Sequence, residues 1–122
     1  MLPPVFALVS TDAGCTAKLG AGDACRCYPF GDAPVDVTRP YVTFFTVAGS
    51  AENTQADAPP SDRFVGQIDA WADSPAAAVS TAQAVRSAVE RYGQVTAYNP
   101  SDRDPETGRY RYSFDAEFVV KR

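Results

Sequence analysis

The sequence predicts an α+β protein: a mostly antiparallel sheet of about five strands, with one long helix packed on one face and a short N-terminal helix. Residues 109–118 alternate without interruption between apolar and polar or charged side chains, which is typical of a strand with one buried face. Residues 74–92 carry apolar side chains at helical spacing. Strands grouped around one long helix favour an α+β architecture, and 122 residues are typical of a single domain, 1–122.

The first forty residues predict only short elements. Residues 2–11 are expected to form a short helix, because two early prolines suit a first helical turn. Residues 11–23 are small, polar and rich in glycine, which is typical of a connector. A short strand is expected over residues 24–30, and the prolines and aspartates of residues 31–40 predict a loop.

Two central strands are predicted on either side of a long polar segment. Residues 41–48 are aromatic and β-branched on both faces, which indicates a strand covered on both sides. Residues 49–62 are polar and are expected to form a long loop. The next strand, over residues 63–71, has one face made of Phe64, Gly66, Ile68 and Ala70 and another made of Val65, Gln67, Asp69 and Trp71. We expect Trp71 to fill the core.

The long helix has boundaries that the sequence marks. Ser74 is the expected N-cap, Pro75 the first helical residue and Gly93 the C-cap. The apolar stripe consists of Ala78, Ala82, Val85, Val89 and Tyr92, and the residues expected to face water are Ser80, Thr81, Gln83, Ser87 and Glu90. Such a stripe of mostly small side chains can lie close to the large rings of the last strand.

A short strand over residues 95–98 and a hairpin lead into the last strand. Pro105 suits the second position of a type I turn, and Gly108 suits the positive φ of a bulged hairpin. The last strand is expected to cross the middle of the core with Tyr110, Tyr112, Phe114, Ala116, Phe118 and Val120, and to expose Arg109, Arg111, Ser113, Asp115 and Glu117.

Composition excludes several classes of function. A net charge of −4 argues against sequence-specific binding of nucleic acid, which needs a basic surface. No apolar run is long enough to span a membrane, and the N-terminus lacks the basic region of a signal peptide. Cys15, Cys25 and Cys27 are expected to be free thiols, because a CxC pair without any histidine or second pair is not a zinc site.

The sequence offers few groups for catalysis. Without histidine there can be no Ser-His or Cys-His pair, and phosphate-binding loops and metalloprotease motifs are absent. One enzymatic alternative is a metal-dependent nuclease, in which Asp69, Asp115 and Glu117 hold Mg²⁺. The other interpretation is that nearby arginines pair with these carboxylates across the sheet. We therefore predict no catalytic residue, cofactor site or metal site.

A charged strand face can also be a protein interface that ion pairs and arginine side chains hold together. The residues predicted to form such an interface, with other subunits or with a partner protein, are Arg63, Asp69, Arg103, Arg109, Arg111, Asp115 and Glu117.

Several stretches resemble the tail completion (tail terminator-like, minor tail) proteins of long-tailed bacteriophages and prophages. They are LPPVFALVS, YPFGDAP followed by RPYVTF, RFVGQIDAWA and SDRDPETGRYRYSFDAEFVV. They occur in the same order as in that family and cover nearly the whole chain. The three cysteines are not part of this resemblance.

The resemblance implies a small α+β structural protein of the virion tail or neck, assembled in the host bacterial cytoplasm and without enzymatic activity. Such subunits form a ring, often a hexamer, on the head-proximal end of the tail tube. The implied partners are other copies of the chain, the tail tube protein and a head–tail connector or head-closure protein. A different neck or head-closure role is the remaining alternative, and no catalytic residue is carried over.

Overall fold

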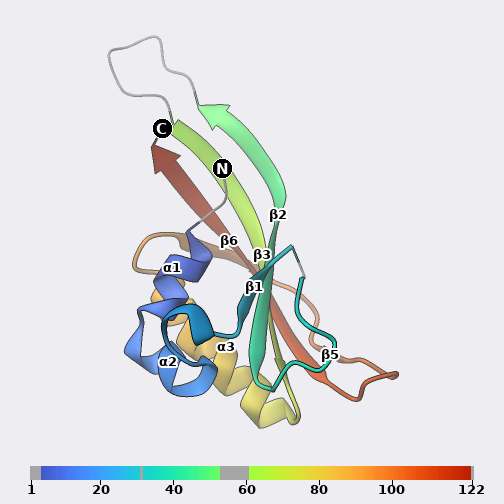
Figure 1. Ribbon diagram of the computed structural model, residues 1–122. Coiled ribbons are helices and arrows are strands. Elements are labelled where there is room, and N and C mark those ends of the chain that lie inside the picture. The colour runs from blue at the N-terminus through green and yellow to red at the C-terminus, as the bar shows by residue number, and fades with distance from the viewer. Residues whose placement is uncertain (1–3, 31, 53–60, 122) are drawn as a thin grey trace.

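The computed structural model describes residues 4–30, 32–52 and 61–121 (Figure 1). Its helices are α1 (Val5–Ser10), α2 (Ala13–Leu19) and α3 (Pro75–Val89), with a 3-10 turn η1 (Gly22–Ala24). Its strands are β1 (Cys27–Pro29), β2 (Tyr41–Glu52), β3 (Ser61–Ala72), β4 (Gln94–Tyr98), β5 (Asp102–Arg103) and β6 (Tyr110–Lys121). None of the helices in these ranges is long and apolar enough to cross a membrane.

The strands form one six-stranded sheet in the order β1-β2-β3-β6-β4, with β5 also paired to β6. Only the β1–β2 pair is parallel, so the sheet is mostly antiparallel, as predicted. β6 lies between β3 and β4, in the interior position expected from its aromatic face. All three helices lie on one face of the sheet, where α3 packs on β3 and β6 and the two short helices pack on α3 (Figure 1).

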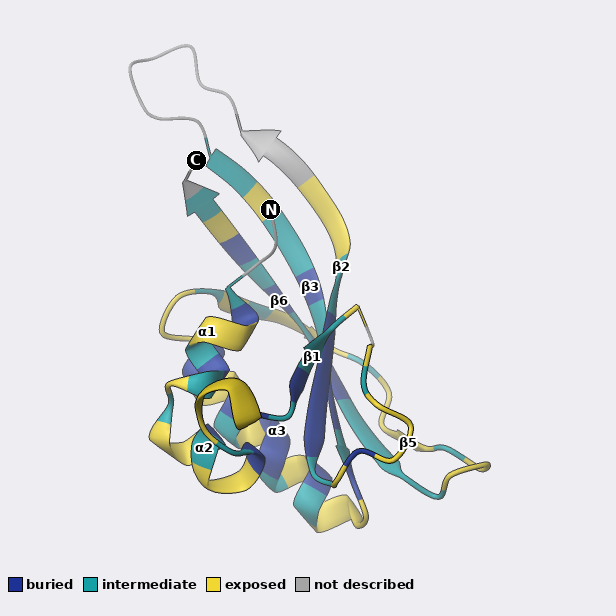
Figure 2. Cartoon of the chain, in the orientation of Figure 1, coloured by how far each residue is buried: buried dark blue, intermediate teal, exposed yellow. Residues whose placement is uncertain are grey.

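The core lies between α3 and the central strands (Figure 2). Phe114 and Phe118 of β6 are fully buried, and they share one core cluster with small residues of α3, Ala82, Val85 and Val89. Large side chains on the sheet and small ones on the helix let the two layers approach closely. Burying one such phenylalanine contributes about 1.5–3 kcal/mol to folding.

The helix boundaries differ in part from the prediction. Ser74 is the N-cap, and its hydroxyl accepts the N–H of Ala77 at 3.2 Å, as expected. Thr81 was expected to face water but is 1% exposed. The helix ends at Val89 with Glu90 as C-cap, so Gly93 does not cap it. A Cβ at Gly93 would instead lie 2.7 Å from the Glu117 carbonyl oxygen, so glycine is required there for close approach to β6.

The predicted connector over residues 11–23 contains helix α2. Asp12 is its N-cap and accepts the Cys15 N–H at 3.0 Å. The signal was present, since aspartate is a strong N-cap residue, but only Cys15 and Leu19 of α2 are buried, too few for a recognisable stripe. The strand expected over residues 24–30 is shorter, because only Cys27–Pro29 pair with β2.

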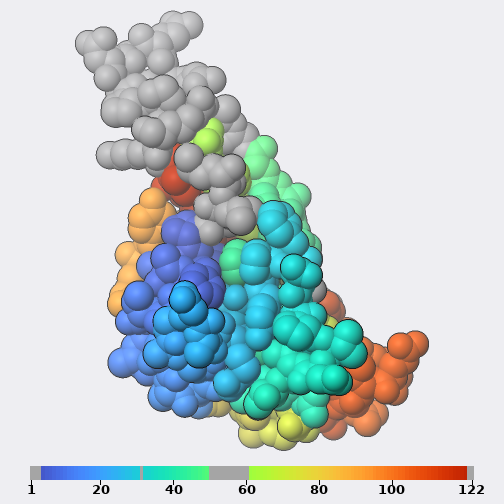
Figure 3. Space-filling view, in the orientation of Figure 1, coloured from blue at the N-terminus to red at the C-terminus, as the bar shows by residue number. Residues whose placement is uncertain are grey.

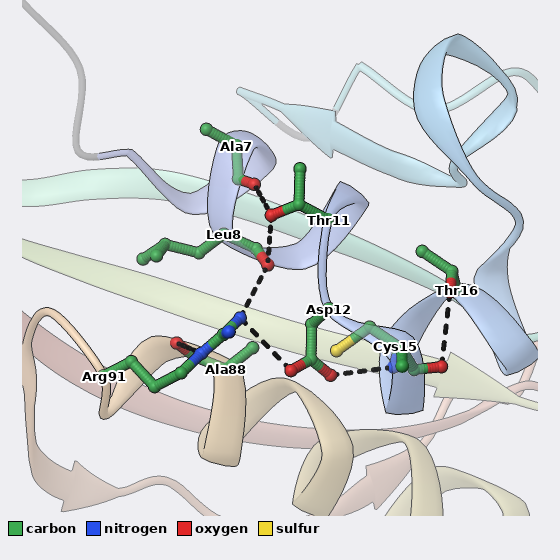
Figure 4. A network of polar contacts seen from close by, with 9 residues as sticks. Ala7, Leu8, Thr11, Asp12, Cys15, Thr16, Ala88 and Arg91 are labelled. Carbon is green, nitrogen blue, oxygen red and sulfur yellow. Dashed lines mark hydrogen bonds and ion pairs between the residues drawn. The ribbon is translucent and has the colours of Figure 1, made fainter.

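One arginine holds the three helices together (Figure 4). The Arg91 Nη2 lies 3.1 Å from the Asp12 carboxylate and donates to the Leu8 carbonyl at 3.3 Å. Its Nε donates to the Ala88 carbonyl at 3.4 Å. Because Leu8 is in α1, Asp12 caps α2 and Ala88 is in α3, these contacts join the ends of all three helices.

The three cysteines are buried free thiols at the junction of the helices with β1. Burial raises the pKa of the Cys15 thiol to about 12 and also raises the pKa values of Cys25 and Cys27. A thiol that stays protonated at neutral pH is a poor nucleophile, so these cysteines serve as small apolar core residues.

The polar segment over residues 49–62 is not all loop. β2 continues to Glu52 and β3 begins at Ser61, with Gly49 paired to Phe64. Residues 53–60, at the centre of the predicted loop, lie outside the described residues. β2, β3 and β6 thus extend beyond the helices as a three-stranded arm (Figure 1). β2 is buried on both faces only over Tyr41–Phe44.

Candidate assembly interface on the open face of the sheet

The sheet face opposite the helices carries the predicted interface residues except Arg103, which pairs with Tyr110 and lies on the side of α3. Strand register places Thr43, Asp69 and Ser113 side by side across β2, β3 and β6, followed by Tyr41, Trp71 and Arg111. Side chains two positions apart on a strand share a face. The alternating positions of β3 and β6 that point away from α3 therefore form one continuous surface, which we call the open face.

The charged residues of the open face pair mostly within the subunit. Arg63 lies 3.2 Å from the Glu117 carboxylate across the β3–β6 pair. Arg111 binds both carboxylate oxygens of Asp102, at 2.9 and 3.0 Å. Such half-exposed pairs contribute about 0–1 kcal/mol each to folding, so they remain available to exchange partners at an interface.

Two of the predicted surface positions are less accessible than their charge suggests. Asp69 is 4% exposed, and its carboxylate accepts from the Gln67 amide at 3.1 Å. Ser113 was expected to face water but is fully buried, and its hydroxyl accepts from the Asn99 amide at 2.9 Å. The same amide donates to Asp115 at 3.0 Å. The segment after β4 therefore covers the middle of β6 on this face.

Aromatic rings and arginines alternate at one end of the open face. The rings of Tyr41 and Trp71 stack, with centroids 6.0 Å apart and an interplanar angle of 8°. The Arg109 guanidinium lies 5.5 Å from the Tyr41 centroid, and that of Arg111 lies 5.9 Å from the Trp71 centroid. Trp71 therefore lies on the open face, half-buried, where its Nε1 donates to Thr43 at 3.0 Å, and the prediction that it fills the core is wrong.

A groove of about 660 Å³ opens beside these rings. Its far wall is the loop over residues 33–36, and Arg109 joins loop to sheet by donating to the Val35 carbonyl at 3.1 Å and the Tyr41 hydroxyl at 2.8 Å. The Arg109 Nε is buried without a hydrogen-bond partner among the described residues. Arg103, by contrast, is exposed and lies 5.8 Å from the Tyr110 centroid.

The carboxylates proposed for a nuclease do not assemble into a metal site. Asp69 is held by Gln67, Asp115 by Asn99 and Glu117 by Arg63. Within the described ranges, no group of three or more histidine, cysteine, aspartate or glutamate side chains could hold a metal ion. The alternative prediction was that arginines pair with these carboxylates, and Glu117 does pair with Arg63. Arg109 instead contacts the Tyr41 hydroxyl and the Val35 carbonyl, and Arg111 pairs with Asp102.

Tyr41 is the residue of this surface that sequence reasoning missed. The signal was the alternation of Tyr41, Thr43 and Phe45 along β2, but only the β2–β3 register places Tyr41 against Trp71. Arginine and aromatic side chains are the residue types enriched at protein interfaces. A sheet with helices on one face and such side chains on the other is a candidate surface for assembly with other proteins.

The chain belongs to the family described as Tail completion protein gp17, whose sequence pattern matches residues 3–121. It is therefore a structural protein of the phage virion tail, as the resemblance implied. A search of curated proteins finds no match. Among solved structures, the chain is similar to one from the virion of a native gene transfer agent (GTA) particle. The TM-score is 0.62 at 17% sequence identity, with 97% of this chain and 92% of that chain covered, so the likeness is one of fold.

Proposed function

We propose that this chain ends growth of the tail tube by forming a ring on the tube's head-proximal end, where it presents the surface that joins the head. The observation that carries the proposal is the open face: in a tail completion protein, a whole sheet face bears arginines, aromatic rings and carboxylates with no helix packed on it. Six subunits is the ring size that the resemblance implies.

The difference between the two edges of the sheet supports a ring. The two edges differ, because one ends in the short parallel strand β1 and the other in β4. Contacts between unlike surfaces are heterologous, and they close into a ring when the rotation between subunits permits. The interface candidates Arg63, Asp69, Arg103, Arg109, Arg111, Asp115 and Glu117 all lie on β3, β5 and β6 or directly before β6.

The arm formed by β2, β3 and β6 supports contact with a second partner. It projects beyond the helices, and Val47 and Val119 are exposed on it. A ring subunit must contact neighbours on two sides and the tube along the axis, so surfaces outside the compact body are needed.

The mass of the assembled protein tests the ring. We expect light scattering on the purified chain, alone and bound to purified tail tubes, to give a closed oligomer of a single size. Because charged contacts are screened by salt, we expect the oligomer to weaken as ionic strength rises. A chain that stays monomeric both in solution and on tail tubes contradicts the proposal.

Adding the purified chain to growing tail tubes distinguishes a tail terminator from another neck component. We expect the purified chain to bind tube ends and stop further addition of tube protein in vitro. Binding to head connectors with no effect on tube growth would instead assign the head-closure role. Bovine serum albumin at the same concentration is the control for non-specific inhibition.

A further inference from the structure

The loop that follows β1 exposes two large apolar side chains. Phe30 is 68% exposed and Val35 is 86% exposed, more than any other large hydrophobic residue among those described. Figure 3 shows this segment, in cyan to teal, on the molecular surface beside the orange β5–β6 hairpin. Large apolar side chains with this much exposure are candidates for an interaction site.

Phe30 is held in an unusual backbone conformation. Its φ of 57° is the only positive value for a non-glycine residue within the described ranges. Bulky residues rarely adopt this region, and such strain is typically retained at functional positions. The Phe30 N–H donates to the Phe44 carbonyl at 2.7 Å, so the strained residue is tied to β2. An exposed aromatic side chain on a backbone held in this way can serve as an interface anchor.

A second surface of the same chain could receive it. An apolar groove of about 340 Å³ lies between the first turns of α3 and the β5–β6 strands. Its apolar lining consists of Pro75, Ala78, Val79, Tyr110 and Tyr112. The volume is at the lower end of the ~300–1,000 Å³ typical of small-ligand pockets, which suits a single aromatic side chain with its neighbours.

The charges around the two surfaces are complementary. Asp32 and Asp36 are exposed on either side of Val35. At the groove, the charge of Arg111 is balanced by its bidentate pair with Asp102, while Arg103 is exposed. The exposed Arg103 at the rim of the groove can therefore pair with an aspartate of the loop, which favours this pairing over contact between two like surfaces.

The two surfaces lie on opposite faces of the sheet. The loop over residues 33–36 lines the groove of the open face and is bound by Arg109, directly before β6, whereas the apolar groove lies on the side of α3. A subunit that inserts its loop into one neighbour still offers its own groove to another. Such a head-to-tail contact can repeat around a ring.

We propose that Phe30 and the loop over residues 32–36 of one subunit insert into the groove between α3 and β5–β6 of a second copy of this chain. The inference rests on the proposed ring and identifies the two surfaces that form its subunit contact. Phe30 packs on Val79 and the tyrosine rings, and the aspartates of the loop pair with Arg103.

Engineered cysteines test the contact directly. After mild oxidation with oxidised glutathione, a mixture of Phe30→Cys subunits and Val79→Cys subunits is expected to give covalent dimers. The double variant is expected to give a ladder that ends at the mass of the closed ring. Tyr92→Cys is the matched control, because Tyr92 is an exposed apolar residue outside the groove, and the wild type reports on the buried native thiols.

The outcomes separate this inference from the ring itself. Rings that form without Phe30–Val79 linkage, or with equal linkage to position 92, overturn the inference and leave the ring in place. Subunits that stay monomeric both alone and on tail tubes overturn both. As a second test, Asp36→Arg and Arg103→Glu are each expected to weaken self-association roughly tenfold, and their combination to restore it. Failure of the combination to restore association also counts against the contact.

Discussion

The Arg109 guanidinium lies 5.5 Å from the ring centroid of Tyr41 and donates to the hydroxyl of the same residue at 2.8 Å. Through its second donor, to the Val35 carbonyl, Arg109 fixes the loop over residues 33–36 to the sheet. Arg109, directly before β6, thus joins two walls of the groove on the open face.

The Arg109–Tyr41 contact is expected to show coupling in a double-mutant cycle. Tyr41→Phe keeps the ring but removes the hydroxyl acceptor, and we expect it to cost about 1 kcal/mol of unfolding free energy. In an Arg109→Met background the same change is expected to cost less, with a coupling energy of about 0.5–1.5 kcal/mol. Urea denaturation of the wild type, the two single variants and the double variant measures this coupling energy. Additive effects would show that the contact does not stabilise the fold.

Gly93→Ala is expected to destabilise the protein by about 1–3 kcal/mol. The added Cβ would lie 2.7 Å from the Glu117 carbonyl oxygen and 2.8 Å from the Phe118 ring, so β4 and β6 would have to move apart. Thermal unfolding measures the loss. The neighbouring change Gln94→Ala, at an exposed position, is the control and is expected to stay within about 0.5 kcal/mol. Equal stability of the two variants would contradict the close approach.

Asp12 has two roles that two substitutions separate. Asp12→Asn retains a good N-cap for α2 but removes the ion pair with Arg91, and we expect a loss of about 0–1 kcal/mol that disappears in high salt. Asp12→Ala removes both, and we expect an additional loss of about 1 kcal/mol that persists in high salt. Unfolding at low and high ionic strength measures both. Identical losses for the two variants would mean that capping contributes nothing.

Phe114→Ala is expected to cost about 3–5 kcal/mol, because a fully buried ring against α3 would leave a cavity. Phe114→Leu removes less of the buried side chain and is expected to cost less than the alanine variant. Chemical denaturation compares them. A small effect of the alanine variant would mean that the two faces of β6 are assigned the wrong way round.

The strongest sequence patterns predicted the layers of the fold. The alternation in β6 and the small-residue stripe of α3 each repeat over many residues, so both faces of the sheet could be assigned. Helix α2 was missed because it is seven residues long and buries only Cys15 and Leu19. The outer ends of β2 and β3 were missed because they are polar and form strands through pairing with each other.

The burial and the contacts of the interface candidates depend on the order of the strands in the sheet. Alternation alone placed Arg109, Arg111, Asp115 and Glu117 on one face. It could not show that Asp69 is buried beneath its neighbours, because that depends on β2 and β6 flanking β3. The stack of Tyr41 on Trp71 likewise depends on pairing between segments thirty residues apart, which single-strand periodicity does not contain.

Tail length in a phage that lacks this chain tests the central claim most directly. If the protein ends tube growth and forms the joining surface, electron microscopy of the deletion mutant is expected to show DNA-filled heads and separate tails, with tubes of abnormal and variable length. Supplying the wild-type gene in trans should restore uniform joined particles. Joined virions with tails of normal length after deletion would contradict the account.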